Sequence, residues 1–171
     1  MDCLDSIMTR RSIRSYTDEP VSDAAIETIL RAAMAAPSAG NQQSWRFVVV
    51  TGAEQRQALS EATPYSRMIA SAPLAIVVCG DTRAEKHPGY WVQDCSAAIE
   101  NALLAVNALG LGAVWIGVHP IEDREANVTA LLGLPDGVRP LSMLAIGHPA
   151  ETKPPAERYD PALVHRERWS G

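Results

Sequence analysis

Ala72-Pro73-Leu74-Ala75-Ile76-Val77-Val78-Cys79 is a short, unbroken apolar run that stops at Gly80. Its apolar residues do not alternate with polar ones, which is typical of a strand buried on both faces of a sheet. The run therefore predicts the central strand of the fold.

Helices and strands alternate on both sides of this run. Downstream, alanines interspersed with larger apolar residues predict the longest helix over Trp91 to Leu109, which is either the core of the monomer or the spine of a dimer. Upstream, Ser22 is a helix cap, and apolar residues recur at helical spacing from there to Pro37. The further elements that we expect are strands at 45–51, 113–118 and 141–147 and helices at 54–61 and 123–132.

Composition limits the classes of protein to consider. The chain has 171 residues with 47% hydrophobic side chains, enough for one domain with a continuous core. A net charge of -5 and a pI near 5.3 argue against nucleic-acid or anionic-membrane partners. The N-terminus does not have the pattern of a signal peptide, and the apolar stretch at 97–106 is too short to span a bilayer. We expect a soluble protein of the cytoplasm.

Several common catalytic and metal-binding patterns are missing. The three cysteines form no CxxC pair, and Cys79 and Cys95 are expected to be buried structural thiols. The four histidines show no i, i+4 pair, so no protein-bound metal is expected. GxSxG, P-loop and GxGxxG motifs are also absent, which removes local support for a serine hydrolase, a P-loop NTPase or a Rossmann dehydrogenase.

Two polar motifs stand out against this background. Arg10-Arg11-Ser12-Ile13-Arg14 combines guanidinium groups with a hydroxyl, a combination that suits an oxyanion such as phosphate. The turn Pro37-Ser38-Ala39-Gly40-Asn41-Gln42-Gln43-Ser44-Trp45 adds carboxamides, which suit the edge of a heterocycle. Together they suggest a phosphorylated cofactor. The alternatives are a solvated face that pairs with Asp18 and Glu19, and ordinary loop chemistry.

Both motifs also carry a family resemblance. Together with Leu109-Gly110-Leu111-Gly112-Ala113-Val114-Trp115-Ile116-Gly117 and Ile146-Gly147-His148-Pro149-Ala150-Glu151, they occur in the order seen in the nitroreductase-like flavoproteins. The chain resembles that family over essentially its whole length. The resemblance implies an α+β, three-layer α/β/α fold around a mixed, mainly antiparallel sheet. It also implies one FMN-binding domain over 1–171 and an intertwined homodimer, with an arm from about residue 150 to 171 that embraces the partner.

The resemblance further implies roles for individual residues. Arg10 and Ser12 would hold the FMN phosphate with Arg11 adjacent, and Arg14 would lie toward the pyrimidine side of the flavin. The backbone of three residues would pass the flavin N5 edge, and four residues of the turn would line the flavin of the other subunit; these are Trp115, Ile116 and Gly117, and Pro37, Ser38, Asn41 and Gln43. Lys153 and Arg158 either complete the phosphate site or keep the arm soluble, and we favour the second role.

The implied activity is that of an FMN-dependent NAD(P)H oxidoreductase, which transfers two electrons as a hydride through flavin N5. The acceptor would be a nitroaromatic, a quinone or a related small organic molecule. Hydride transfer needs no side-chain acid or base, so no catalytic residue is assigned, whereas a guanidinium such as Arg14 would favour the reduced flavin. The alternatives are a specialised relative of dehalogenase, dehydrogenase or flavin-destructase type, and a flavin-binding or small-ligand-binding dimer without turnover.

Overall fold

The computed structural model describes residues 2–169, and a four-stranded antiparallel sheet lies at its centre. The strands are β1 (Trp45–Val50), β2 (Leu74–Asp81), β3 (Gly112–Gly117) and β4 (Val138–Gly147), in the order β1-β2-β4-β3. Every residue of β2 is buried, which confirms the prediction from its apolar run. An isolated parallel bridge between Ser12 and Ala113 adds the N-terminal segment beside β3, so the sheet is mixed only at that edge.

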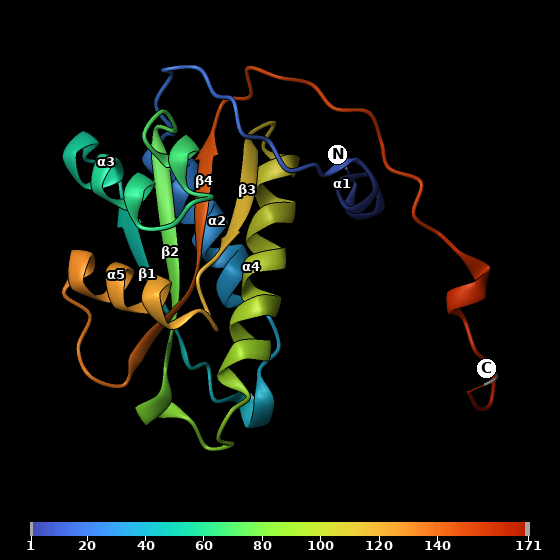
Figure 1. Ribbon diagram of the computed structural model, residues 1–171. Helices are drawn as coiled ribbons and strands as arrows, with labels where there is room; N and C mark the ends of the chain where they lie inside the picture. Colours follow the sequence, from blue (N-terminus) through green and yellow to red (C-terminus); the bar gives the residue numbers. More distant parts are fainter. Residues whose placement is uncertain (1, 170–171) are drawn as a thin grey trace.

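Two helices cover each face of the sheet (Figure 1). On one face, α2 (Asp23–Met34) and α4 (Trp91–Ala108) pack in a core that includes Ile29, Ile99 and Ile76. On the other, α3 (Ala53–Glu61) and α5 (Glu122–Leu132) contribute Leu59 and Val128 to a second core. The expected α+β fold with three layers is confirmed.

Individual residues mark where several helices begin and end. The Ser22 side chain accepts a hydrogen bond from the Ala25 N–H and begins α2 as expected. Gly133 ends α5 in the left-handed conformation, with φ of 61°. A further helix, α1 (Cys3–Thr9), was not expected from the sequence. Short 3-10 turns complete the structure at Ala39–Asn41, Arg67–Ile69, Thr82–Ala84 and Pro161–Leu163.

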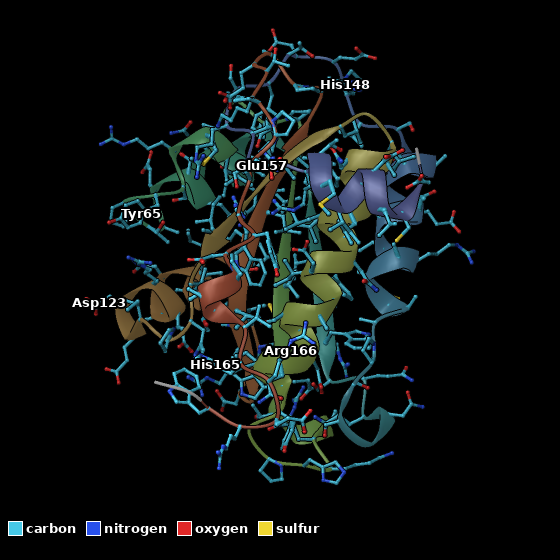
Figure 2. All side chains as sticks on the ribbon, turned by 90° about the vertical axis from the view of Figure 1, so that its right-hand side faces the viewer. Tyr65, Asp123, His148, Glu157, His165 and Arg166 are labelled. Atoms are coloured by element: carbon cyan, nitrogen blue, oxygen red, sulfur yellow. The ribbon has the colours of Figure 1, made fainter. Side chains whose placement is uncertain are left out.

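The chain beyond β4 runs as an extended arm that leaves the body of the molecule (Figure 1). Figure 2 views the molecule from the side of this arm, where Glu157, His165 and Arg166 mark its course. Tyr159 and Trp169 are 82% and 81% exposed. The arm therefore presents large apolar side chains to solvent in a single chain.

Two of the three cysteines lie in the core. Cys79 and Cys95 are buried, as expected, and burial raises the pKa of each thiol to about 12. Within residues 2–169, no group of three His, Cys, Asp or Glu side chains is placed to hold a metal ion. In the same described part of the chain, no helix has the length and apolar character needed to cross a bilayer.

Candidate functional site

The segment Arg10–Arg14 lies directly along β3. The Ile13 N–H donates to the Ala113 carbonyl oxygen at 2.9 Å, which fixes the segment beside the strand. Gly112 makes this approach possible, because a Cβ there would lie 2.8 Å from the Cβ of Ile13. The sequence thus places three arginines at the edge of the sheet.

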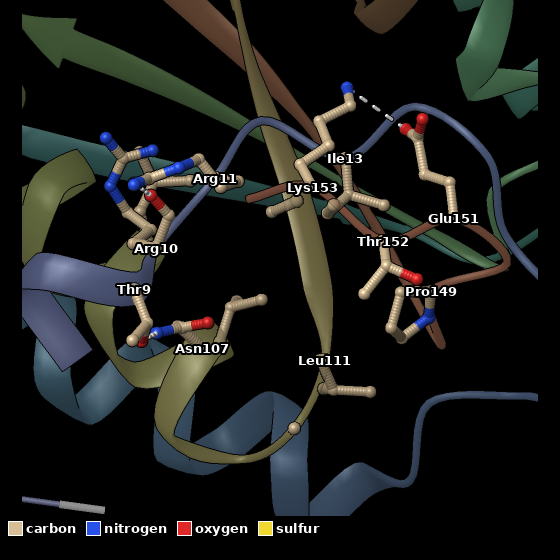
Figure 3. Close-up of a pocket in the computed structure, with 14 residues that line it drawn as sticks. Thr9, Arg10, Arg11, Ile13, Asn107, Leu111, Pro149, Glu151, Thr152 and Lys153 are labelled. Atoms are coloured by element: carbon tan, nitrogen blue, oxygen red, sulfur yellow. Dashed lines mark hydrogen bonds and ion pairs between the residues drawn. The ribbon is translucent and has the colours of Figure 1, made fainter. Parts of the chain in front are cut away.

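Arg10 and Arg11 open onto a cavity of about 220 Å³, here called the cationic pocket. It lies between the N-terminal segment, the C-terminal end of α4, β3 and the start of the arm (Figure 3). Its lining combines three cationic side chains with an apolar floor: Thr9, Arg10, Arg11, Ile13, Leu103, Val106, Asn107, Gly110, Leu111, Ala113, Pro149, Glu151, Thr152 and Lys153. The pocket therefore has the charge and size of a site for a small anionic group.

Two of the three cationic side chains are fixed by backbone oxygens. Arg11 Nε donates to the Pro154 carbonyl oxygen at 2.8 Å and Arg11 Nη1 to that of Arg10, while Lys153 Nζ donates to that of Ser12 at 2.6 Å. Arg11 Nη2 is buried and has no hydrogen-bond partner within residues 2–169. A buried guanidinium N–H without a partner is costly, and a phosphate oxygen would satisfy it with a charge-assisted hydrogen bond. The donors present therefore fit a phosphate group.

Glu151 joins the arm to the arginine motif. Its Oε1 accepts a hydrogen bond from the Arg14 N–H at 2.6 Å and lies 3.3 Å from Lys153 Nζ. The hydrogen bond from the Arg14 backbone, helped by Lys153, lowers the pKa of Glu151 below its ordinary value. Glu151 is therefore ionised at neutral pH and holds both cationic residues in place.

A second cavity, here called the edge pocket, lies further along β3. It has a volume of about 430 Å³ and is lined by Arg14, Pro64, Tyr65, Arg67, Met68, Val114, Trp115, Ile116 and Gly117. Trp115 is 38% exposed there, whereas Ile116 is 3% exposed. Arg14 lines this pocket and Arg10 the first one, so a single segment of five residues joins the two.

Several residues of these pockets were not found from the sequence. The segment from Pro64 to Met68 leads into the 3-10 turn Arg67–Ile69, and its sequence has no periodicity that would mark it as functional. Arg124 of α5 stacks over the Tyr65 ring, with its Cζ 5.2 Å from the ring centroid, and Arg124 Nη1 donates to the Gly117 carbonyl oxygen at 3.2 Å. Lys153 lines the cationic pocket, so it does more than keep the arm soluble, whereas Arg158 is exposed.

The polar turn lies at the opposite end of α4 from the cationic pocket (Figure 1). Asp94, in the first turn of α4, accepts hydrogen bonds from the Ala39 N–H at 2.9 Å and from Gln42 Nε2 at 2.7 Å. α4 has 18 residues and is about 27 Å long at 1.5 Å per residue. Within one chain the structure therefore does not bring the turn together with the arginine motif.

The turn that carries these exposed side chains has an unusual backbone conformation. Asn41 and Gln43 both have positive φ, 54° and 49°, and Gln43 Nε2 donates to Asn41 Oδ1 at 2.7 Å. Pro37 is exposed as well, and Ser38 is half-buried, with its Oγ accepting from the Gln43 N–H at 3.1 Å. These four predicted site residues lie together in the turn, at the far end of α4 from the cationic pocket of their own chain.

Comparison with known proteins agrees with this architecture. The sequence model of the Nitroreductase family matches residues 7–148. A protein of Methanothermobacter thermautotrophicus, provisionally named NADH dehydrogenase/NAD(P)H nitroreductase, is 47% identical over 169 residues, covering 99% of this chain and 88% of that one. The Bacillus subtilis protein named FMN reductase (NAD(P)H) is 32% identical, with coverage of 98% and 74%.

A solved structure gives the same result at the level of the fold. A protein of Desulfovibrio desulfuricans, provisionally named a nitroreductase and solved in complex with FMN, superposes with a TM-score of 0.85. It is 35% identical, and the match covers 99% of both chains. The sequence model covers most of the chain, and the relatives and this structure cover nearly all of it, which shows that the chain belongs to the nitroreductase family.

Proposed function

We propose that the protein is an FMN-dependent NAD(P)H oxidoreductase that works as a homodimer and passes two electrons to nitroaromatic, quinone or related organic acceptors. The observation that carries the proposal is the buried, partnerless Arg11 Nη2 in a pocket that also holds Arg10 and Lys153. The names of the relatives, which include FMN reductase and NAD(P)H nitroreductase, support the choice of cofactor and electron donor.

In this proposal the cationic pocket binds the phosphate of FMN. Arg10 and Arg11 supply charge-assisted hydrogen bonds and Lys153 adds a third positive charge. Ser12, whose hydroxyl was expected to share this role, is not among the residues that line the pocket. Because backbone oxygens hold Arg11 and Lys153 in place, and Glu151 adds an ion pair to Lys153, these two side chains need little ordering when the phosphate binds. The phosphate thereby anchors the rest of the cofactor at the edge of β3.

The edge pocket takes the flavin ring, which when bound accepts a hydride and passes two electrons on. Arg14 places a guanidinium where negative charge collects on the reduced ring, and so favours reduction. Gly117 has no Cβ, so its backbone can approach the ring closely, while Trp115 and Ile116 form an apolar wall. No side chain has to exchange a proton in this step.

Each site draws on two subunits in this proposal. Pro37, Ser38, Asn41 and Gln43 lie at the far end of α4 from the cationic pocket of their own chain, so they line the flavin of the partner. The exposed apolar side chains of the arm are buried on that partner.

The test is the absorbance spectrum of the purified protein before and after anaerobic addition of NADH and then NADPH. We expect the two flavin bands, which bleach with the preferred donor and return when a quinone or a nitroaromatic compound is added. A yellow protein that neither donor bleaches would indicate a flavin binder without turnover. A colourless protein that fails to take up added FMN would overturn the proposal.

The phosphate role has its own test in Arg10→Ala. Loss of a hydrogen bond to a charged group costs about 1.5–3 kcal/mol, so we expect FMN to bind roughly ten- to a hundredfold more weakly. The matched control is Arg31→Ala on α2, where the side chain is 78% exposed in an ion pair with Glu27. Equal FMN affinity in the two variants would exclude Arg10 from the phosphate site.

A further inference from the structure

Glu100 of α4 lies beside Arg10, which lines the cationic pocket. Its Oε1 is 3.4 Å from Arg10 Nε, and the Arg10 side chain is 21% exposed. The Glu100 side chain is 47% exposed, so water screens the pair in part, but the lower exposure of Arg10 lets the carboxylate reduce the effective charge of the guanidinium. Glu100 is not itself part of the pocket lining. Its influence on a ligand is therefore through charge.

Two carboxylates partly offset the positive charge of the pocket. Its three cationic side chains are Arg10, Arg11 and Lys153, and Lys153 already lies 3.3 Å from the Glu151 carboxylate. Glu100 offsets a second positive charge, that of Arg10. Arg11 alone has no carboxylate within ion-pair distance among the pairs of residues 2–169. A phosphate monoester carries about -1.5 to -2 at neutral pH, so two acidic side chains compete with it for the same cations.

We propose that Glu100 sets the affinity of the phosphate subsite: its carboxylate offsets the charge of Arg10 and weakens the binding of a phosphorylated flavin. The inference rests on the proposed function, because it assigns the pocket to the FMN phosphate. Its consequence is a cofactor that exchanges with the FMN in solution more readily than the three cationic side chains alone would allow. Glu100 thus moderates retention of the cofactor without touching it.

The experiment compares wild type, Glu100→Gln and Glu100→Asp, each stripped of flavin and then titrated with FMN while the flavin fluorescence is followed. Riboflavin, which has no phosphate, is the second probe. We expect Glu100→Gln to bind FMN about three- to tenfold more tightly than wild type, with the difference shrinking at high salt. Riboflavin affinity should not change. Glu100→Asp keeps the charge and should remain close to wild type.

The matched control is Glu27→Gln, which removes one carboxylate from an exposed ion pair with Arg31 on α2. It should leave FMN affinity unchanged. Equal FMN affinity in wild type and Glu100→Gln would overturn the inference. Weaker binding by Glu100→Gln would overturn it as well, because Glu100 would then orient Arg10 for the phosphate. An equal gain for FMN and riboflavin would show an effect that does not act through the phosphate.

These outcomes are separate from failure of the proposed function. A wild-type protein that binds neither FMN nor riboflavin would overturn the assignment of the pocket itself. Wild type that binds FMN but shows no response to Glu100→Gln would overturn only the role of Glu100.

Discussion

Glu151 connects two parts of the chain that lie 137 residues apart. Its carboxylate accepts the Arg14 N–H and faces Lys153, so one side chain positions residues of both pockets. Folding lowers its pKa, chiefly through the hydrogen bond from the Arg14 backbone. A carboxyl group with a lowered pKa stabilises the fold only while it is ionised.

This linkage predicts how stability depends on pH. The contribution of Glu151 should be fully present above the ordinary glutamate pKa of about 4.3 and should be lost as the pH falls through the lower pKa of the folded state. We expect Glu151→Gln to have a lower melting temperature than wild type at neutral pH, with a difference that shrinks as the pH falls from the ordinary pKa through the lower pKa of the folded state. Thermal unfolding over this range measures both.

The control for this prediction is Glu157→Gln, because Glu157 is an exposed residue of the same arm. It should follow wild type at every pH. If the melting temperature of Glu151→Gln stayed equally far below that of wild type in acid, the shape of the Glu151 side chain, and not its charge, would account for the stabilisation.

Single residues also show what a sequence can and cannot reveal about the site. The chemistry of Arg10, Arg11 and Arg14 could be predicted because the three lie within five residues, and a local cluster of charge is visible without a structure. Lys153 could not be assigned in this way. It reaches the Ser12 carbonyl oxygen across 141 residues, and only the course of the arm after β4 brings the two together.

Among the elements, those with a strong apolar pattern were predicted and α1 was not. β2 and α4 bury most of their length, so the pattern of their side chains reflects their surroundings. In α1, Leu4 and Met8 are each 68% exposed in the single chain, and the helix buries only Ser6. The apolar residues of α1 do not pack in a core of their own chain, so a search for a buried helix face does not find this helix. The turn at 37–43 was found because its carboxamides are local, but its distance from the arginine motif depends on the length of α4.

The contact of the N-terminal segment with β3 gives a test at this scale. In Gly112→Ala, the new Cβ would meet Ile13 at 2.8 Å and push residues 10–14 away from the strand. We expect a loss of about 1–3 kcal/mol in the free energy of unfolding and weaker binding of FMN. Urea denaturation measures the first effect and flavin titration the second.

Gly52→Ala is the matched control, because nothing lies within 4 Å of a Cβ at Gly52. It should leave FMN binding unchanged and cost at most about 1 kcal/mol of stability, because Gly52 is the N-cap of α3 and alanine is a poorer N-cap than glycine. If the two variants proved equally stable, the segment would not depend on close packing against Gly112.

Across the described residues, the most exposed apolar side chains lie on α1 and on the arm, outside the two cores. They include Leu4 and Met8 of α1 and Tyr159, Leu163 and Trp169 of the arm. A single chain that leaves this much apolar surface in water is typical of a subunit. The same observation explains why the fold class could be predicted from sequence while the assembly remains a proposal.

Removal of residues 155–171 tests the role of the arm and leaves Lys153 in place. We expect the full chain to be a dimer in light scattering and the shortened chain to dissociate at concentrations where the full chain does not, because the apolar contacts of the arm are lost. Leu131→Ser is the control, since Leu131 is an exposed apolar residue of α5 that lies outside the arm and outside both pockets. An identical mass for the full and shortened chains at all concentrations would contradict the proposed embrace.

The placement of the arginine motif and the polar turn at opposite ends of α4 has a genetic consequence. In the proposed dimer, each site combines the arginine motif of one chain with the polar turn of the other. A defect in the motif of one chain and a defect in the turn of its partner can therefore compensate for each other. A chain that lacks the whole arginine motif and a chain with a broken turn are each inactive as homodimers. A hybrid of the two would contain one site with both defects and one site with none, so two null alleles expressed together would restore part of the activity that each has lost.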